Sequence, residues 1–128
     1  GKIMKELKLK KCLKCGSLIK VIEDCHCEEC GIVCCNQEMK IIDANTTDAS
    51  VEKHKPTYSV ENDKLVVRVN HVMESEHYIE WICLITDNKE EYVYFNHSDE
   101  PVAIFDNVNM GTIYSYCNLH GLWKTDIE

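Results

Sequence analysis

Four histidines and one cysteine beyond position 50 have the residue types and spacing for metal chemistry. Cys117 and His120 form a CxxH pair, His71 and His77 bracket a five-residue segment, and His54 lies further upstream. The histidines lie close to turn or loop positions, where a rigid β scaffold presents converging side chains. Taken singly, each would be an ordinary solvated histidine, and Cys117 a small buried residue.

Considered together, four imidazoles and one thiolate form a donor set that is too large for a closed tetrahedral zinc site. Five donors of intermediate and soft character suit iron, and they leave one coordination position open for a small ligand. Iron with a single thiolate ligand keeps a positive local charge in either oxidation state, so it would attract a small anion. The set therefore predicts a redox centre that acts on such an anion.

A second group of potential metal ligands is a cluster of cysteines near the N-terminus. Seven of the nine cysteines fall within 24 positions, at Cys12, Cys15, Cys25, Cys27, Cys30, Cys34 and Cys35. In a reducing compartment this density favours metal binding over disulfides, and the odd total disfavours a complete disulfide framework. The segments 12–16 and 27–31 are two CxxCG knuckles with the spacing of a rubredoxin or a zinc ribbon.

The charge and hydropathy of the chain exclude several classes of partner. A formal net charge of -8 argues against non-specific binding to nucleic acid or to anionic membranes, because the summed field would repel both. No apolar stretch approaches the roughly 20 residues that span a bilayer, and the first eleven residues lack the apolar region of a secretory signal. We therefore expect a cytoplasmic protein with no membrane and no nucleic-acid partner.

Three blocks of sequence resemble, in order, the desulfoferrodoxin and neelaredoxin family of superoxide reductases. They are Glu52-Lys53-His54 followed by Pro56, His71-Val72-Met73 with His77-Tyr78-Ile79-Glu80-Trp81, and Cys117-Asn118-Leu119-His120-Gly121-Leu122-Trp123. The N-terminal blocks Cys12-Leu13-Lys14-Cys15-Gly16 and Val33-Cys34-Cys35, with Met39 following, resemble the desulforedoxin-like module of the two-iron members. The resemblance thus covers nearly the whole chain.

The resemblance implies a function and a role for each residue of the C-terminal site. The catalytic iron would be held equatorially by His54, His71, His77 and His120, with Cys117 as the axial thiolate opposite the open position. By the same resemblance, Lys53 would attract superoxide and help protonate the peroxide, and Glu52 would occupy the oxidised iron after product leaves. The implied reaction is the one-electron reduction of superoxide to hydrogen peroxide, a defence against oxidative stress, with a rubredoxin-like protein as the electron donor.

For the N-terminal site, the resemblance implies a rubredoxin-type iron held by Cys12, Cys15, Cys34 and Cys35, with zinc as the alternative metal. The second knuckle keeps Cys27 and Cys30 as alternative ligands. Three roles are open for Cys25, Cys27 and Cys30: they could be spare thiols, substitute ligands for the same metal, or a second soft-metal site.

The elements that must position these residues are strands. Five segments rich in β-branched and aromatic residues recur between turn signals, namely Leu65–Val69, Tyr78–Ile85, Tyr92–Phe95, Val102–Phe105 and Thr112–Tyr116. They predict an all-β sandwich or barrel. In the longest segment, alternation puts Ile79 on the opposite face from Ile82 and Leu84. The resemblance further implies an immunoglobulin-like sandwich of seven strands and a homodimer.

The chain is predicted to contain two domains and a linker. Residues 1–40 are too few to fold on a hydrophobic core alone, which predicts a metal-stapled, desulforedoxin-like module. Residues 41–50 are small and polar and predict a linker, and residues 51–128 would form the sandwich that carries the catalytic iron.

Two other functions are compatible with the same motifs. One is a zinc ribbon joined to a β-sandwich that serves as a binding module, and it predicts a colourless zinc protein. The other is an electron carrier without catalysis, in which the C-terminal histidines are incidental. Metal analysis tests the first alternative, and rapid superoxide consumption by the reduced protein would exclude the second.

Overall fold

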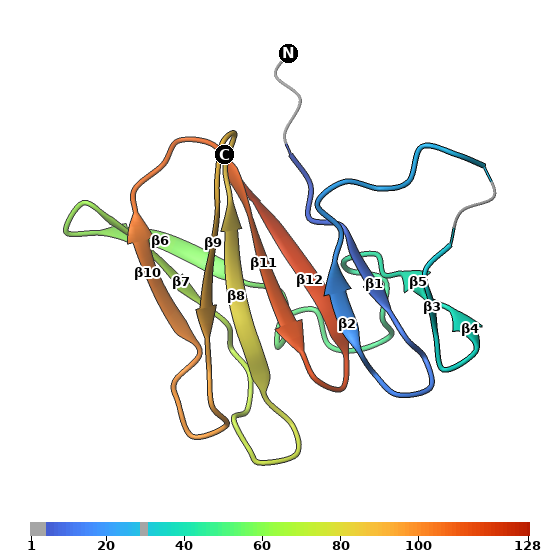
Figure 1. Cartoon of the computed structure of the whole chain (residues 1–128). Helices are drawn as coiled ribbons and strands as arrows, with labels where there is room; N and C mark the ends of the chain where they lie inside the picture. The colour runs from blue at the N-terminus through green and yellow to red at the C-terminus, as the bar shows by residue number, and fades with distance from the viewer. Residues whose placement is uncertain (1–4, 29–30) are drawn as a thin grey trace. The chain divides into compact units, whose positions relative to one another are not determined.

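The computed structural model describes residues 5–28 and 31–128 of the chain (Figure 1). Twelve strands are the only regular elements in these ranges. They are β1 (Leu9–Lys11), β2 (Leu18–Lys20), β3 (Val33–Cys34), β4 (Gln37–Glu38), β5 (Lys40–Ile41), β6 (Thr57–Glu61), β7 (Lys64–Arg68), β8 (Ile79–Ile85), β9 (Glu90–Tyr94), β10 (Val102–Asp106), β11 (Gly111–Cys117) and β12 (Gly121–Ile127). The all-β prediction is therefore confirmed. None of the described residues belongs to a helix long and apolar enough to cross a membrane.

The chain divides into two compact units. The first, called here the N-terminal module, comprises Glu6–Asp43, and the second, called the β-sandwich, comprises Ala44–Glu128 together with Lys5. The residues Lys40–Ile41 of β5 pair with β1, so the segment 41–50 that was predicted to be a linker begins inside a strand. The reason is local, because the β-branched Ile41 favours an extended, paired backbone.

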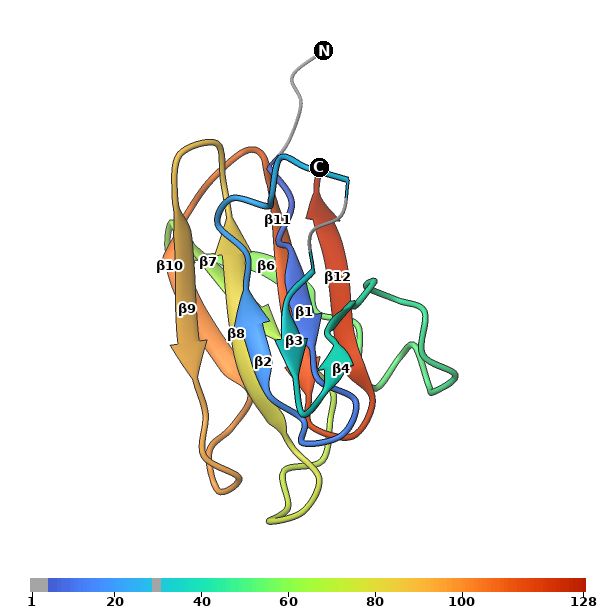
Figure 2. The same cartoon turned by 45° about the vertical axis from the view of Figure 1, so that its right-hand side comes forward.

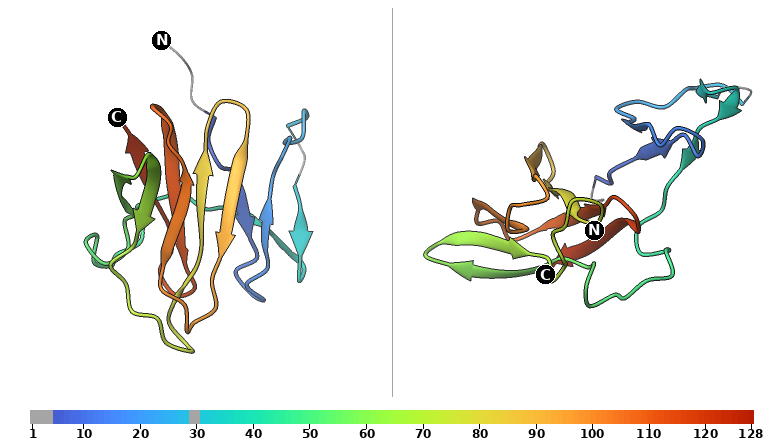
Figure 3. Two further views of the ribbon diagram at one scale, coloured as in Figure 1. Left: turned by 90° about the vertical axis from the view of Figure 1, so that its left-hand side faces the viewer. Right: turned by 90° about the horizontal axis from the view of Figure 1, so that it is seen from below.

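The β-sandwich contains seven strands in two antiparallel sheets. One sheet has the order β10-β7-β6, and the other has the order β12-β11-β8-β9. Figures 2 and 3 show the two sheets as separate layers. The prediction of a seven-stranded sandwich is confirmed. The strands β6 and β12, which the sequence pattern did not reveal, lie at the edges of their sheets.

The core of the β-sandwich lies between the two sheets. Its buried members are Leu65, Val67, Val69, Ile79, Ile82, Leu84, Ala103, Phe105, Ile113, Cys117 and Ile127. Ile79 joins Ile82 and Leu84 in this core although simple alternation places it on the other face. The register between β8 and β11 shifts there, so that Cys117 pairs with Ile79. A β-bulge of this kind re-aims the side chains next to it, and here it turns Ile79 toward Cys117.

The N-terminal module has a small sheet and very little apolar interior. Strands β2, β1 and β5 form its three-stranded sheet, and β3 and β4 form a hairpin. Its buried apolar side chains in the described ranges are Leu7, Leu9, Cys12 and Met39. So few buried groups cannot offset the conformational entropy lost on folding, which means that the module needs another source of stability.

Candidate metal centre

Five side chains converge at one end of the β-sandwich. Ligand atoms of His54, His71, His77, Cys117 and His120 all lie within 4.8 Å of one another. His54 precedes β6, and His71 and His77 lie between β7 and β8. Cys117 is the last residue of β11, and His120 lies in the turn before β12. Residues that span more than half of the sequence are thus brought together, as the sequence predicted.

The turn between β11 and β12 places Cys117 and His120 on the same side. Cys117 pairs with Gly121 in the β11–β12 register. Gly121 adopts a φ of 79°, a backbone conformation that residues other than glycine rarely adopt. The backbone N–H of His120 donates to the Cys117 Sγ at 3.4 Å. The tight turn therefore aims both ligands at a common point and stabilises negative charge on the sulfur.

The segment that carries His71 and His77 is fixed by hydrogen bonds. The backbones of Glu74 and His77 exchange two hydrogen bonds, of 3.0 Å and 3.2 Å. The Asn118 side chain accepts from the backbone N–H of Tyr78 at 2.9 Å and donates to the carbonyl of Glu76 at 2.9 Å. The backbone N–H of Asn118 also donates to the Tyr78 carbonyl, at 3.2 Å. Asn118 therefore holds the residues around His77 next to the turn that begins at Cys117.

Hydrogen bonds determine which imidazole nitrogens can bind a metal. The Nδ1 atoms of His54 and His71 donate to the backbone carbonyls of Ser50 and Val72. Since a carbonyl can only accept, each Nδ1 carries the proton and each Nε2 keeps its lone pair. His120 instead presents Nδ1, which lies 2.9 Å from the His54 Nε2. The sequence left this choice of nitrogen undetermined.

The electrostatics of the group favour a bound cation. Burial lowers the pKa of His54, and it lowers the pKa of His71 to about 4, so both imidazoles are neutral. Burial also raises the pKa of the Cys117 thiol, although hydrogen bonds from the backbone N–H groups of His120 and Leu119 oppose this effect. A metal ion would supply the charge that a buried thiolate needs. Five neutral or soft donors around one point therefore fit iron with an open position.

A second group of ligands lies in the N-terminal module. Sulfur atoms of Cys12, Cys15, Cys34 and Cys35 lie within 4.8 Å of one another. The backbone N–H of Cys15 donates to the Cys12 sulfur at 3.4 Å and lowers the Cys12 pKa to about 6. Four thiolates in this arrangement fit the second, rubredoxin-type iron of a two-iron protein.

The remaining N-terminal cysteines have separate environments. Cys27 is an exposed free thiol outside the four-cysteine group, and Cys30 lies outside the described residues. Cys25 is disulfide-bonded, an outcome that the expectation of free or metal-bound thiols did not include. The density and odd number of cysteines favour metal binding over a complete disulfide framework, but they do not exclude a single disulfide in a module that also binds metal.

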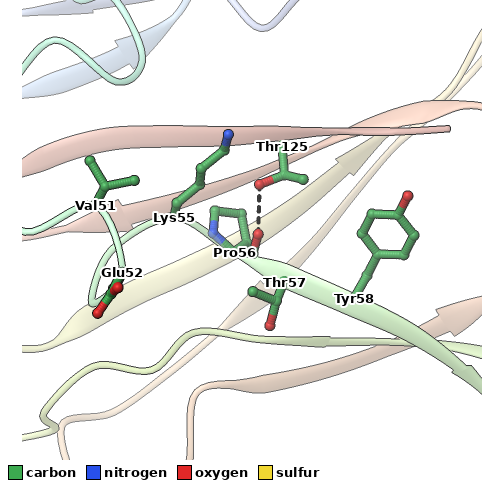
Figure 4. A pocket seen from close by; sticks show the side chains of 7 residues that line it. All are labelled: Val51, Glu52, Lys55, Pro56, Thr57, Tyr58 and Thr125. Atoms are coloured by element: carbon green, nitrogen blue, oxygen red, sulfur yellow. Dashed lines mark hydrogen bonds between the residues drawn. The ribbon is translucent and has the colours of Figure 1, made fainter.

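Glu52 and Lys53 directly precede His54 in the sequence and are not part of the histidine group. Both are exposed, in the turn that also contains His54. Glu52 and Lys55 line a cavity of about 430 Å³ whose other walls are Val51, Pro56, Thr57, Tyr58 and Thr125. Figure 4 shows the Glu52 carboxylate and the Lys55 ammonium group pointing to different sides of the backbone. The turn thus places exposed, charged residues directly before His54 in the sequence.

Two residues that contact the ligand histidines were not assigned a role from sequence. Trp123 was recognised as part of a motif, and Ser115 was not singled out. Both are buried, and both contact His54. A serine between apolar neighbours in a strand is a signal that could have marked Ser115, because a buried hydroxyl requires a hydrogen-bond partner.

Comparisons with known proteins agree with this geometry. The family model described as Desulfoferrodoxin matches residues 46–126 of the chain. A desulfoferrodoxin homolog from Archaeoglobus fulgidus is 39% identical over 119 residues, covering 90% of this chain and 93% of the relative. A desulfoferrodoxin from Clostridium acetobutylicum is 43% identical over 99 residues, covering 75% and 79%. The superoxide reductase from Treponema pallidum superimposes with a TM-score of 0.71 at 27% identity, covering 94% of this chain and 99% of that structure.

Proposed function

Because this chain belongs to the desulfoferrodoxin family, we propose that it is a superoxide reductase. The observation that carries the proposal is the convergence of four imidazoles and one thiolate within 4.8 Å. The Treponema pallidum protein, whose structure is similar over 94% of this chain, is a superoxide reductase. The catalytic iron would be held by His54, His71, His77, His120 and Cys117.

When bound, the iron supplies one electron to superoxide, which with two protons becomes hydrogen peroxide. The protein's own contribution begins with Cys117, which is 0% exposed and would be the thiolate ligand of the iron. Neutral imidazoles of His54 and His71 leave the local charge of the metal uncompensated. An anion would therefore be attracted to the open position in spite of the acidic net charge of the chain.

Lys53 and Glu52 are proposed as the catalytic side chains. No ion pair engages Lys53 among the described residues, so its ammonium group is available to attract superoxide and to supply a proton through water. Glu52 is its neighbour in an exposed turn, and its carboxylate would be an additional ligand for the iron. The position of both residues directly before His54 supports these roles.

The N-terminal module is proposed to hold the accessory iron through Cys12, Cys15, Cys34 and Cys35. We propose a module of residues 1–40, a linker of residues 41–50 and a catalytic domain of residues 51–128. The boundary between the two compact units, after Asp43, lies within the proposed linker, although β5 extends to Ile41. The electron donor is proposed to be a small rubredoxin-like protein, and the active form a homodimer that protects the cytoplasm against superoxide.

The two alternative functions have less support. A pure electron carrier requires the C-terminal histidines to be incidental, whereas four of them converge with Cys117. A zinc-binding module does not need five donors at one point, since structural zinc sites use four. Both alternatives still make distinct predictions for metal content and activity.

A stopped-flow experiment with metal quantitation tests the proposed function. The reduced protein should contain iron and consume superoxide rapidly without evolving oxygen, which separates reduction from dismutation. Cys117→Ser should abolish the rapid reaction, whereas Cys83→Ala, which removes the other buried thiol of the β-sandwich, should retain it. A colourless zinc protein, or full activity in Cys117→Ser, would exclude the proposal.

A further inference from the structure

Trp123 contacts two of the proposed iron ligands at once. It is a residue of β12 and is 1% exposed. Its indole ring stacks on the His54 imidazole, with the ring centroids 5.0 Å apart and the planes inclined by 24°. Its indole N–H donates to the carbonyl of His120 at 3.1 Å. One side chain therefore joins the turn that carries His54 to the turn that carries His120.

Ser115 supports the same arrangement from the neighbouring strand. It lies directly opposite Trp123 in the β11–β12 register and is 0% exposed. Its hydroxyl donates to the backbone carbonyl of His54 at 2.8 Å. His54 is therefore held at three points: Ser115 fixes its backbone, Trp123 covers one face of its ring, and the Ser50 carbonyl binds its Nδ1 at 2.6 Å.

This support matters because His54 belongs to an irregular segment. It lies in a turn before β6, whereas Cys117 is held within the β-ladder. A ligand on a turn would lose conformational freedom when it binds a metal, and that loss weakens binding. Contacts with the rigid β11–β12 ladder impose the bound orientation in advance. The conformational entropy of His54 is then lost during folding and not when the metal binds.

We propose that Trp123, with Ser115 behind it, is a positioning residue that preorganises His54 and His120 for the catalytic iron. The inference rests on the proposed iron site and adds to it a residue that need not touch the metal. It predicts that the indole ring and the indole N–H contribute separately, the ring by orienting His54 and the N–H by fixing His120. Iron retention should therefore fall in two steps as these groups are removed.

The experiment measures iron release from the iron-loaded full-length protein to a chelator. Release from the His4Cys site is followed at the absorption of iron bound by one thiolate, and the four-thiolate iron of the same molecule is the internal reference. Trp123→Leu, which removes both contacts, should raise the release rate by about 10-fold to 100-fold, the range typical for groups that orient metal ligands. Trp123→Phe, which keeps an aromatic ring, should show a smaller increase.

Trp81 provides a matched control. It is the other tryptophan of the chain, it is 8% exposed in β8, and it stacks on Tyr116 at 5.4 Å. Trp81→Leu should destabilise the sandwich through a comparable loss of packing and leave iron release from the His4Cys site within about 2-fold of the native rate. Ser115→Ala should accelerate release less than Trp123→Leu does.

The inference is overturned if Trp123→Leu and Trp81→Leu accelerate iron release equally, because Trp123 would then act only through general stability. Unchanged release in Trp123→Phe and Ser115→Ala, both conservative enough to fold if Trp123→Leu does not, would also overturn it. The readout does not use superoxide. A native protein that retains iron but reduces no superoxide would therefore refute the proposed function and leave this inference testable.

Discussion

Single hydrogen bonds determine how the imidazoles of the catalytic site are oriented. The carbonyls of Ser50 and Val72 fix the protons of His54 and His71 on Nδ1, which leaves Nε2 for the metal. Motifs such as CxxH predict that histidines bind, but the carbonyls that select a nitrogen belong to the backbone and depend on its conformation. This level of detail requires the folded chain.

The cysteine set of the N-terminal module leads to a prediction for two single substitutions. Cys34 belongs to the group of four sulfurs within 4.8 Å, and Cys27 does not. Cys34→Ser should therefore abolish the ferric four-thiolate absorption bands, because an alcohol is a poor ligand for this iron. Cys27→Ser, the matched control, should retain the bands. Absorption spectra of the iron-loaded variants decide the question, and loss of the bands only in Cys27→Ser would show that the second knuckle supplies the ligands.

The strands show which elements a sequence pattern can reveal. Strands β7 to β11 were anticipated to within a few residues because their β-branched and aromatic side chains alternate or are buried on both faces. The edge strands β6 and β12 were missed. Strand β6 is mostly exposed, and β12 mixes buried and half-buried positions, so neither has a strong apolar pattern. Hydrogen bonds to a neighbouring strand define them instead.

The sequence predicted the ligands of the candidate site but not the residues that position those ligands. No single histidine or cysteine marks a metal site, but the combination of four histidines with Cys117, together with the family resemblance, predicted the ligand set that converges in the structure. The contacts of Ser115 and Trp123 follow from the register of β11 and β12, which places the two residues opposite each other. A register is a long-range property, and no local pattern specifies it.

Asn118 is predicted to stabilise the segment before β8 that carries the proposed ligand His77. Asn118→Ala would remove the partners of the Tyr78 N–H and the Glu76 carbonyl. We expect a loss of about 1 to 3 kcal/mol in unfolding free energy and faster iron release from the His4Cys site, because His77 lies between these two residues. Urea unfolding and chelator assays measure both effects. Asn109→Ala, in an exposed loop, should change stability by less than about 0.5 kcal/mol. Equal effects of both variants would contradict the role of Asn118.

The β6–β7 hairpin is predicted to lose an ion pair in acid. Hydrogen bonds from the Arg68 guanidinium, 2.7 Å and 3.3 Å long, lower the pKa of Glu61 from 4.5 to about 2. The unfolded chain then binds the proton at a higher pH than the folded chain does, so the stabilisation is present above about pH 4.5 and disappears as the pH falls through about 2.

The stability difference between the native protein and Glu61→Gln should therefore be constant near neutral pH and shrink below about pH 4.5. Urea unfolding at several pH values measures it. Glu91→Gln is the control, since no ion pair is recorded for Glu91 in the described ranges. The effect should be small because both partners are about half exposed and solvent screens them. A difference that grows in acid would contradict the assigned sign.

The two units differ in how they can be stabilised. The β-sandwich buries eleven side chains in one continuous core, which can maintain the fold without metal. The described part of the N-terminal module buries only Leu7, Leu9, Cys12 and Met39 as apolar groups. A unit below about 40 residues usually needs a disulfide, a metal or an oligomer to fold. Metal bound by the four-cysteine group is the proposed source of stability for this module.

Metal removal should therefore unfold one unit and spare the other. After chelation in the presence of a reductant, which eliminates the disulfide of Cys25, amides of β1 and β2 should exchange with solvent at nearly unprotected rates. Amides of β8 and β11, which lie at the centre of the sandwich sheet, should remain protected. Hydrogen exchange measured by mass spectrometry or NMR resolves these strands, and added zinc should restore protection to β1 and β2 by reforming the four-thiolate site. Persistent protection of β1 and β2 in the metal-free, reduced protein would show that the few buried side chains of the module suffice, whereas loss of protection in β8 would show that the sandwich itself depends on its metal.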